Sequence, residues 1–430
     1  MYTGWVSAPA DRRQAELAAL AALAGTELRR ATAGIAKVHS SIADGVFGGL
    51  RMAFGRRAQP VRMVHDALSV ATYTTVGESA DLIGRLAAVG AELPRAGAAP
   101  SETARGAVAL GILNGLIGDQ LADDASPLAT GMSIRAGGRA VPPTAAALRA
   151  AFPSAGGHIT VFLHGLMESE YAWEIGGRPT YGARLSADLW TTEVRIRYNS
   201  GRHISDNGHA LGELLAALVL LWPVPVTDIS LIGHSMGGLV IRSACERAVR
   251  ADMYWARLLR HTVYLGTPHL GAPVAKGVHA ATAGLARSSM TAPFGNLLRR
   301  RSAGVRDLFH GTLTEQGWLD VDRDMLRQPL PDDAPLQQNV RHLFATASVT
   351  RRAGHPLGRL LGDGLVLAES GRGQSRRRTI GLRPSDGIHI GGAHHFTLLN
   401  HADVYTWLRS ELGPRRALES GTDTIGLNVR

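Results

Sequence analysis

The hydrophobic and polar positions of the chain change their spacing near residue 125. Before it, apolar residues recur every three or four positions, most clearly over 12–48, and again over about 60–93 and 102–121. This spacing places apolar side chains on one face of a helix. We therefore expect a helical region over 1–125. Its pattern leaves two roles open: packing within the protein, or contact with a lipid surface or a partner.

After residue 125, short apolar runs alternate with helical stretches. This alternation is typical of βα units built around a mostly parallel sheet. The expected strands cover 159–163, 192–198, 228–232, 262–265 and 340–346. The expected crossover helices cover 203–221, with Ser205 and Asp206 as possible caps, and 236–250. We therefore expect an α/β domain over 126–412, followed by a loose tail over 413–430.

The composition is that of an ordinary globular protein. Of its 430 residues, 45% are hydrophobic and 19% are charged, which indicates neither disorder nor a membrane protein. The longest apolar runs, 107–118 and 214–226, are shorter than the roughly 18 to 20 residues of a spanning helix. The sequence shows no secretory-signal pattern, and its single cysteine, Cys245, cannot form an intramolecular disulfide. We expect a cytoplasmic protein, with peripheral membrane contact left open.

The formal net charge of +10 bears on possible partners. Nucleic acid or an anionic membrane would be ordinary partners of so basic a chain. However, only Lys37 and Lys276 among the 46 basic residues are lysines, and the chain is also rich in alanine and glycine. That bias is typical of a whole genome's composition more than of a binding patch. We expect no nucleic-acid partner, and the sequence leaves the oligomeric state open.

The clearest motif is Gly-His-Ser-Met-Gly-Gly at 233–238, between an expected strand and an expected helix. A serine hydroxyl becomes an effective nucleophile when a sharp turn lifts it clear of the backbone beside a base. Side chains two positions before or after that serine would clash with neighbouring backbone, which favours Gly233 and Gly237. The motif therefore predicts Ser235 as a nucleophile, the alternative being a glycine-rich phosphate loop or a plain turn.

A second motif, His-Gly-Leu at 164–166, follows the first expected strand of the α/β domain. In hydrolases with such a serine turn, two backbone amides bind the negative oxygen of the reaction intermediate. One follows the nucleophile, and the other lies in a loop after an earlier strand. We expect Met236 to supply the first amide and Leu166 the second, with Met167 as the alternative. His164 is expected to hold the loop.

A general base is expected near the end of the α/β domain, where Gly-Ala-His-His-Phe-Thr occupies 392–397 before a final helix. His395 is our choice, His394 is the alternative, and His401 is interpreted as a helix-surface residue. Because the chain has 17 histidines, a histidine by itself indicates little. The choice rests on the position of this histidine pair relative to the serine motif.

The acid of such a triad lies between the serine and the histidine in the chain. Asp363 lies in a glycine-flanked loop after an expected strand and could orient His395 and stabilise its protonated ring. Asp386 is the main alternative, and Asp320 or Asp322 would fit less well. The sequence has no His-Glu-x-x-His helix, Walker loop or EF-hand loop, so we expect neither a metal nor a cofactor.

Together, these motifs resemble a known group of enzymes. The resemblance also involves Arg-Tyr-Asn-Ser-Gly at 197–201, Gly-Thr-Pro-His-Leu-Gly at 266–271, Gly-Asp-Gly-Leu-Val at 362–366 and His-Phe-Thr-Leu-Leu at 395–399. In this order they resemble bacterial lipases and esterases of the α/β-hydrolase superfamily, above all the group related to triacylglycerol lipases and inositol-deacylase-type hydrolases. The resemblance covers about 126–412.

The resemblance implies a serine esterase or lipase that acts through an acyl-serine on a small-molecule or lipid ester, without a cofactor. It implies Ser235 as nucleophile, Asp363 as acid, His395 as base, and the Leu166 and Met236 amides as oxyanion donors. The N-terminal helical region has no counterpart in small lipases. Two alternatives stay open: an acyltransferase that uses the same triad, and a non-catalytic protein that binds lipid or a partner.

The stretch 271–311 has no strand pattern and interrupts the α/β domain. We expect it to form a helical lid or cap over the site. Its apolar residues Met290, Phe294, Leu297 and Leu298 make an apolar acyl pocket a reasonable hypothesis.

Overall fold

The computed structural model describes residues 9–24, 97–271, 302–319, 334–352, 355–375 and 378–413. Several sequence predictions lie outside these residues: the helix over about 60–93, the part of the first helix over 25–48, most of the lid with its four apolar residues, Asp320 and Asp322, and the tail after residue 413.

An eight-stranded sheet forms the centre of the protein, with the strand order β2-β1-β4-β3-β5-β6-β7-β8. The strands are β1 (Ser133–Ala136), β2 (Arg139–Val141), β3 (His158–Leu163), β4 (Thr192–Arg197), β5 (Asp228–His234), β6 (Leu259–Leu265), β7 (Arg341–Ser348) and β8 (Gly387–Gly391). Strands β3 to β8 pair in parallel, whereas β1 is antiparallel to both β2 and β4. The expected α/β fold with a mostly parallel sheet is confirmed.

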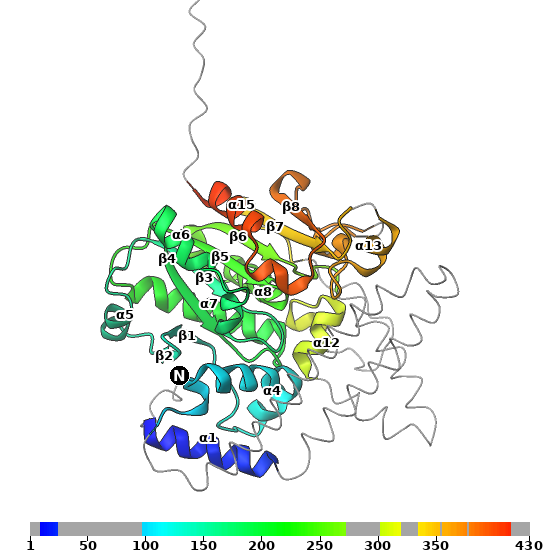
Figure 1. Ribbon diagram of the computed structural model, residues 1–430. Helices are drawn as coiled ribbons and strands as arrows, with labels where there is room; N and C mark the ends of the chain where they lie inside the picture. Colours follow the sequence, from blue (N-terminus) through cyan, green and yellow to red (C-terminus); the bar gives the residue numbers. More distant parts are fainter. Residues whose placement is uncertain are drawn as a thin grey trace, which may run out of the picture.

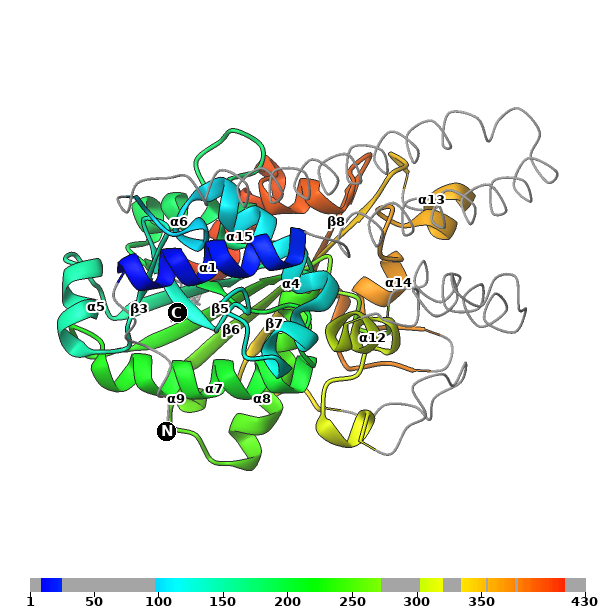
Figure 2. The same cartoon turned by 90° about the horizontal axis from the view of Figure 1, so that it is seen from below.

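Helices cover both faces of this sheet (Figures 1 and 2). The α-helices are α1 (Pro9–Ala24), α4 (Ala104–Asp123), α5 (Ala145–Ala151), α6 (Tyr181–Leu189), α7 (Ile204–Leu221), α8 (Met236–Arg250), α9 (Trp255–Leu258), α12 (Ala303–His310), α13 (Pro356–Leu361), α14 (Ala368–Gly371) and α15 (Ala402–Leu412). Short 3₁₀ segments are η2 (Pro100–Glu102), η3 (Glu170–Glu174), η4 (Glu315–Gly317), η5 (Pro384–Asp386) and η6 (His395–Leu399).

Two buried cores lie on opposite faces of the sheet, because successive side chains of a strand point to opposite sides. Val161 and Leu163 of β3 pack with α7 and α8 in one core. Phe162, between them, packs with α6 and α15 in the other. Both faces are therefore covered, as parallel sheets require.

Helix α7 is long and apolar enough to cross a membrane, the one such helix among the described residues. Here it packs along α8, with Leu211, Leu215 and Leu218 in the core of the sheet, which is the position of a core helix. The helix expected over 203–221 is present, but neither Ser205 nor Asp206 is its cap, because the N-cap position is His203. The helix begins at Ile204, whose N–H donates to the Asp307 carboxylate of α12 at 2.8 Å, so a distant residue takes the place of a local cap.

Helix α4 packs across loops that follow β3 and β4. A Cβ added to Gly111 would lie 2.5 Å from the Glu168 carbonyl oxygen, and one on Gly115 would lie 2.3 Å from Cγ of Met167. Only glycine permits so close an approach of the helix to these loops. The part of the N-terminal region that forms α4 therefore packs within the protein, directly on the segment that follows β3.

Candidate active site

Ser235 lies at the sharp turn between β5 and α8. Its φ of 51° and ψ of −120° lie in a region that non-glycine residues rarely adopt. A Cβ on Gly233 would lie 2.5 Å from the carbonyl carbon of Gly237, and one on Gly237 would lie 2.5 Å from the Leu163 oxygen. The backbone is therefore as crowded at these two glycines as the serine motif predicts.

His395 is buried and hydrogen-bonded to Asp363. The distance between His395 Nδ1 and Asp363 Oδ2 is 2.7 Å, and the His395 N–H donates to the Asp363 carbonyl oxygen at 3.0 Å. The other carboxylate oxygen, Oδ1, accepts hydrogen bonds from the amides of Leu365 and Val366. Burial by itself would lower the pKa of His395, but the charge and hydrogen bond of Asp363 outweigh it and raise that pKa above its usual value.

The ring of His395 lies beside the turn that carries Ser235. The Ser235 N–H donates to the Leu265 carbonyl oxygen at 2.8 Å, and a Cβ on the next residue, Gly266, would lie 3.0 Å from Cε1 of His395. The ring of His234, the residue before Ser235, has its centroid 4.7 Å from that of His395. Among the described residues, Asp363 is the one hydrogen-bond partner of the His395 ring, so Nε2 has no described partner.

The alternative acid and base lie elsewhere. His394 is exposed, and its pKa is lowered by partial burial and by neighbouring His395. Asp386 lies immediately before β8, and its carboxylate pairs with Arg383 at 2.7 Å and with Arg341 at 3.5 Å. Ser235, in contrast, follows the end of β5. Because β5 and β8 run in the same direction, Asp386 and Ser235 lie at opposite edges of the sheet. The structure thus brings Asp363, and not Asp386, to His395.

The segment Gly165–Glu168, here called the oxyanion loop, lies against Ser235. A Cβ on Gly165 would lie 3.1 Å from the Cβ of Ser235. The Met167 N–H donates to Ser200 Oγ at 3.0 Å, whereas the Leu166 N–H has no hydrogen-bond partner among the described residues. An amide without a protein acceptor can serve as an oxyanion donor, so this difference favours Leu166 over Met167.

His164 is a structural neighbour of this loop. Its Nε2 accepts from the Tyr198 N–H at 3.2 Å, the Tyr198 hydroxyl donates to the His164 carbonyl oxygen at 2.8 Å, and the two rings stack with centroids 4.3 Å apart. Burial lowers the pKa of His164. A neutral, fully buried ring in these contacts fixes the start of the oxyanion loop.

Sequence reasoning missed Glu168 and His234. Glu168 Oε2 accepts from the Gly165 N–H at 2.6 Å, and Oε1 lies 3.0 Å from Nδ1 of His234. Burial would raise the pKa of Glu168, but the charge and hydrogen bond of His234 and the Gly165 amide together lower it. The sequence signals were that His234 lies within the serine motif and that Glu168 closely follows the His-Gly-Leu motif.

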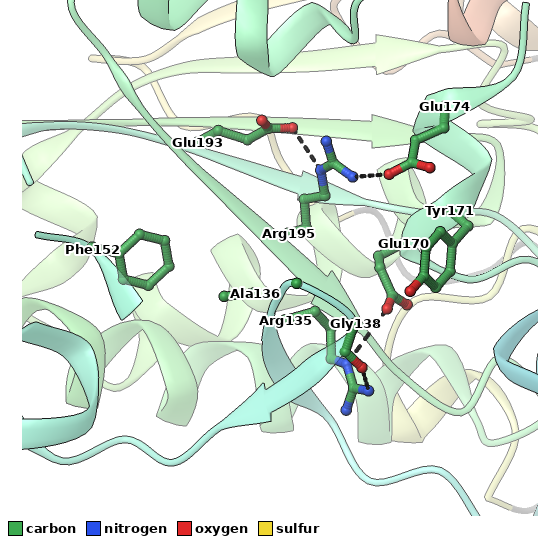
Figure 3. Close-up of a pocket in the computed structure, with 10 residues that line it drawn as sticks. Arg135, Ala136, Gly138, Phe152, Glu170, Tyr171, Glu174, Glu193 and Arg195 are labelled. Carbon is green, nitrogen blue, oxygen red and sulfur yellow. Dashed lines mark hydrogen bonds and ion pairs between the residues drawn. The ribbon is translucent and has the colours of Figure 1, made fainter. Parts of the chain in front are cut away.

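A cavity of about 360 Å³ lies beside the β1–β2 hairpin (Figure 3). Its charged side chains pair with one another: Arg195 lies 2.7 Å from Glu193 and 2.8 Å from Glu174. None of the candidate catalytic residues lines it. Among the described residues, no group of three or more His, Cys, Asp or Glu side chains could hold a metal ion.

The chain is similar to known proteins over part of its length. A protein-family model described as "PGAP1-like alpha/beta domain" matches residues 192–283, which include β4, β5, the serine turn and β6. The chain resembles the α/β hydrolases. A search of curated proteins gave no match.

Solved structures with a similar fold include several lipases and esterases. A lipase of Bacillus licheniformis, BlEst2 in its mature form, is 19% identical, with a TM-score of 0.37 over 60% of this chain and 92% of that one. A lipase-esterase related protein from Clostridium acetobutylicum is 11% identical (TM-score 0.33; 59% and 94% covered). An esterase of Pyrobaculum calidifontis is 13% identical (TM-score 0.34; 60% and 77% covered). These likenesses are too distant to assign a substrate or a reaction.

Proposed function

We propose that the protein is a serine hydrolase that cleaves carboxylic esters, with Ser235 as nucleophile, His395 as general base and Asp363 as the acid that orients the base. The observation that carries the proposal is the buried His395, held by Asp363 at 2.7 Å beside the strained turn of Ser235. A serine, an imidazole and a carboxylate with these relations are what acyl transfer through a serine requires.

The reaction would take two steps. In the first, Nε2 of His395 takes the Ser235 proton as Oγ attacks the ester carbonyl, and the imidazolium then gives that proton to the departing alcohol, leaving an acyl-serine. In the second, the same nitrogen takes a proton from water as the water oxygen attacks the acyl carbon, and the proton returns to Ser235 as the acid leaves. Asp363 stabilises the imidazolium in both steps.

Negative charge develops on the former carbonyl oxygen in each step. The Met236 amide, at the first turn of α8, and the Leu166 amide of the oxyanion loop would donate to it. Loss of one such donor typically costs about 3 to 4 kcal/mol of transition-state stabilisation. The backbone of the oxyanion loop should therefore matter as much as a catalytic side chain.

Apolar acyl esters, including lipid esters, are the proposed substrates. This proposal comes from the apolar residues of the predicted lid, which lie outside the described residues, and from the resemblance. A cytoplasmic location is proposed on the sequence pattern, which leaves peripheral membrane contact open.

The test is labelling with a fluorophosphonate probe, combined with turnover of short-chain and long-chain nitrophenyl esters. For Ser235→Ala we expect complete loss of labelling and a fall in kcat on the order of 10⁶. Ser230→Ala, in the same strand, is the matched control and should keep both. A labelled, active Ser235→Ala protein would refute the assignment, and ester products formed with an added alcohol would indicate the acyltransferase instead.

A further inference from the structure

Glu168 determines the shape of the oxyanion loop. Its Oε2 accepts from the Gly165 N–H at 2.6 Å, and its own N–H faces the Gly165 carbonyl oxygen at 3.4 Å. The side chain thus closes a small ring of contacts around Leu166, whose amide is the proposed oxyanion donor. Since Gly165 lies against Ser235, this ring sets the distance from that amide to the nucleophile.

His234 connects Glu168 to the other half of the site. The ring is fully buried, with Nδ1 3.0 Å from Glu168 Oε1 and Nε2 3.4 Å from the His395 carbonyl oxygen. Both of these oxygens are acceptors, and a neutral imidazole can donate from one nitrogen only. The Nδ1–Glu168 contact is the shorter of the two, so we assign the hydrogen bond that the ring donates to Glu168, whose own pKa is lowered.

From these contacts we propose that Glu168 and His234 form a hydrogen-bonded pair that positions the oxyanion loop against Ser235. The inference rests on the proposed hydrolase function and adds two positioning residues to it. Neither side chain needs to touch the substrate. Glu168 acts through the Gly165 amide, and His234 acts through Glu168 and the backbone of His395.

The negative charge of Glu168 also affects the pKa of the proposed base, His395. It adds to the charge of Asp363 in favouring the protonated form of His395. The other titratable or charged groups around the pair and the base are His164 of the β3 end, Glu170 of η3, Arg197 and Tyr198 at the β4 end, and His394. The residue of helix α4 that lies against Glu168 is Gly111, which carries no charge. Removing the Glu168 charge should therefore let His395 lose its proton at lower pH.

The experiment compares Glu168→Gln and Glu168→Ala in the full-length chain, with kcat and KM for a nitrophenyl ester measured across pH. For Glu168→Ala, which loses the acceptor for Gly165, we expect a fall in kcat approaching the roughly hundredfold loss of a missing oxyanion donor, with KM changed by less than about threefold. Glu168→Gln keeps an acceptor but not the charge. We expect a smaller fall, about fivefold, and an acid limb of kcat/KM displaced to lower pH.

Glu170→Gln is the matched control, because Glu170 is a buried carboxylate two residues away that pairs with Arg197 rather than with the site. Its removal should lower thermal stability and leave the acid limb in place. An unchanged kcat in Glu168→Ala, or an unmoved acid limb in Glu168→Gln, would overturn the proposal. If Glu168→Ala does not fold, the near-isosteric Glu168→Gln decides alone. Failure of the hydrolase proposal is distinct: the parent would then show no Ser235-dependent labelling or turnover.

Discussion

The two halves of the candidate site are held in place in different ways. The base half consists of Asp363 and His395, which bind each other through both side chain and backbone, at 2.7 Å and 3.0 Å. The oxyanion half is a loop whose side-chain support comes from Glu168 and whose outer side lies against α4. The base half is fixed within the α/β domain, while the oxyanion half also depends on a helix from before it.

This difference gives α4 a function that its sequence pattern does not reveal. The helix contributes nothing to the sheet, yet Gly111 and Gly115 lie directly over Glu168 and Met167. Another of its contacts involves α12: Ser302, which caps that helix, donates to the Gly115 carbonyl oxygen at 2.6 Å. Changes in α4 should therefore damage catalysis before they unfold the domain, whereas changes in the base half should remove catalysis outright.

The largest expected effect is in the base half. Asp363→Asn keeps the size of the side chain but removes its charge. With the amide oxygen held by the Leu365 and Val366 N–H groups, the NH₂ group rather than an acceptor would face Nδ1 of His395. We therefore expect kcat to fall by about 10⁴, the loss seen when a triad carboxylate is replaced by its amide. Fluorophosphonate labelling should slow in parallel, and circular dichroism should be unchanged. A variant within tenfold of the parent would show that Asp363 is not the acid.

A smaller effect is expected from the oxyanion half. In Gly111→Ala the new Cβ would lie 2.5 Å from the Glu168 carbonyl oxygen, which is backbone and has to move. We expect kcat to fall by about 10- to 100-fold, with KM nearly constant, because a displaced amide loses part of its transition-state contact. Val108→Ala, on a more exposed position of the same helix, should leave kcat unchanged. Equal kcat values for both variants would remove α4 from the site.

Strand length explains which parts of the fold the sequence predicted. The strands β3, β5, β6 and β7 were predicted because each has a mostly apolar run next to turn residues, and β4 because its apolar residues alternate with polar ones. The three elements β1, β2 and β8 were missed. They have three to five residues each and include arginine, histidine or glycine, so no run stands out. Arg135 of β1 is buried against Glu170, and a paired buried charge cannot be told from a surface residue by sequence.

The site was predictable to a similar degree and for a related reason. Ser235 and its glycines form a local motif, so a single stretch of sequence identified them. The choice between Asp363 and Asp386 depends on which end of a parallel strand each residue adjoins. That is known only once the order and direction of the strands in the sheet are known. Glu168 and His234 are 66 positions apart in the chain, and a pair at such a separation leaves no local pattern.

A few-fold effect is expected from pH. The active enzyme needs neutral His395, whose pKa is raised by Asp363, so the acid limb of kcat/KM should lie above the ordinary histidine value of about 6.5. The free energy of unfolding depends on pH with the opposite sign. The stabilisation from the contact of His395 with Asp363 is fully present below the pKa that His395 has in the unfolded chain, and it is lost as the pH rises through the pKa that His395 has in the folded protein. Urea unfolding and kcat/KM over pH 5 to 9 test both signs together. An acid limb below about 6.5 would contradict the raised pKa.

The smallest effect should come from Asp386, which makes it the sharpest check on the comparison between the two halves. Its carboxylate binds Arg383 and Arg341 at the edge of the sheet away from Ser235. Asp386→Asn should therefore weaken the fold by about 1 kcal/mol, the range of exposed or partly exposed ion pairs, and leave kcat within about twofold. Urea unfolding and ester turnover measure the two quantities on the same sample. If Asp386→Asn lost turnover while Asp363→Asn kept it, the base would have to be oriented from the far edge of the sheet. The base half would then no longer be the locally fixed half of the site.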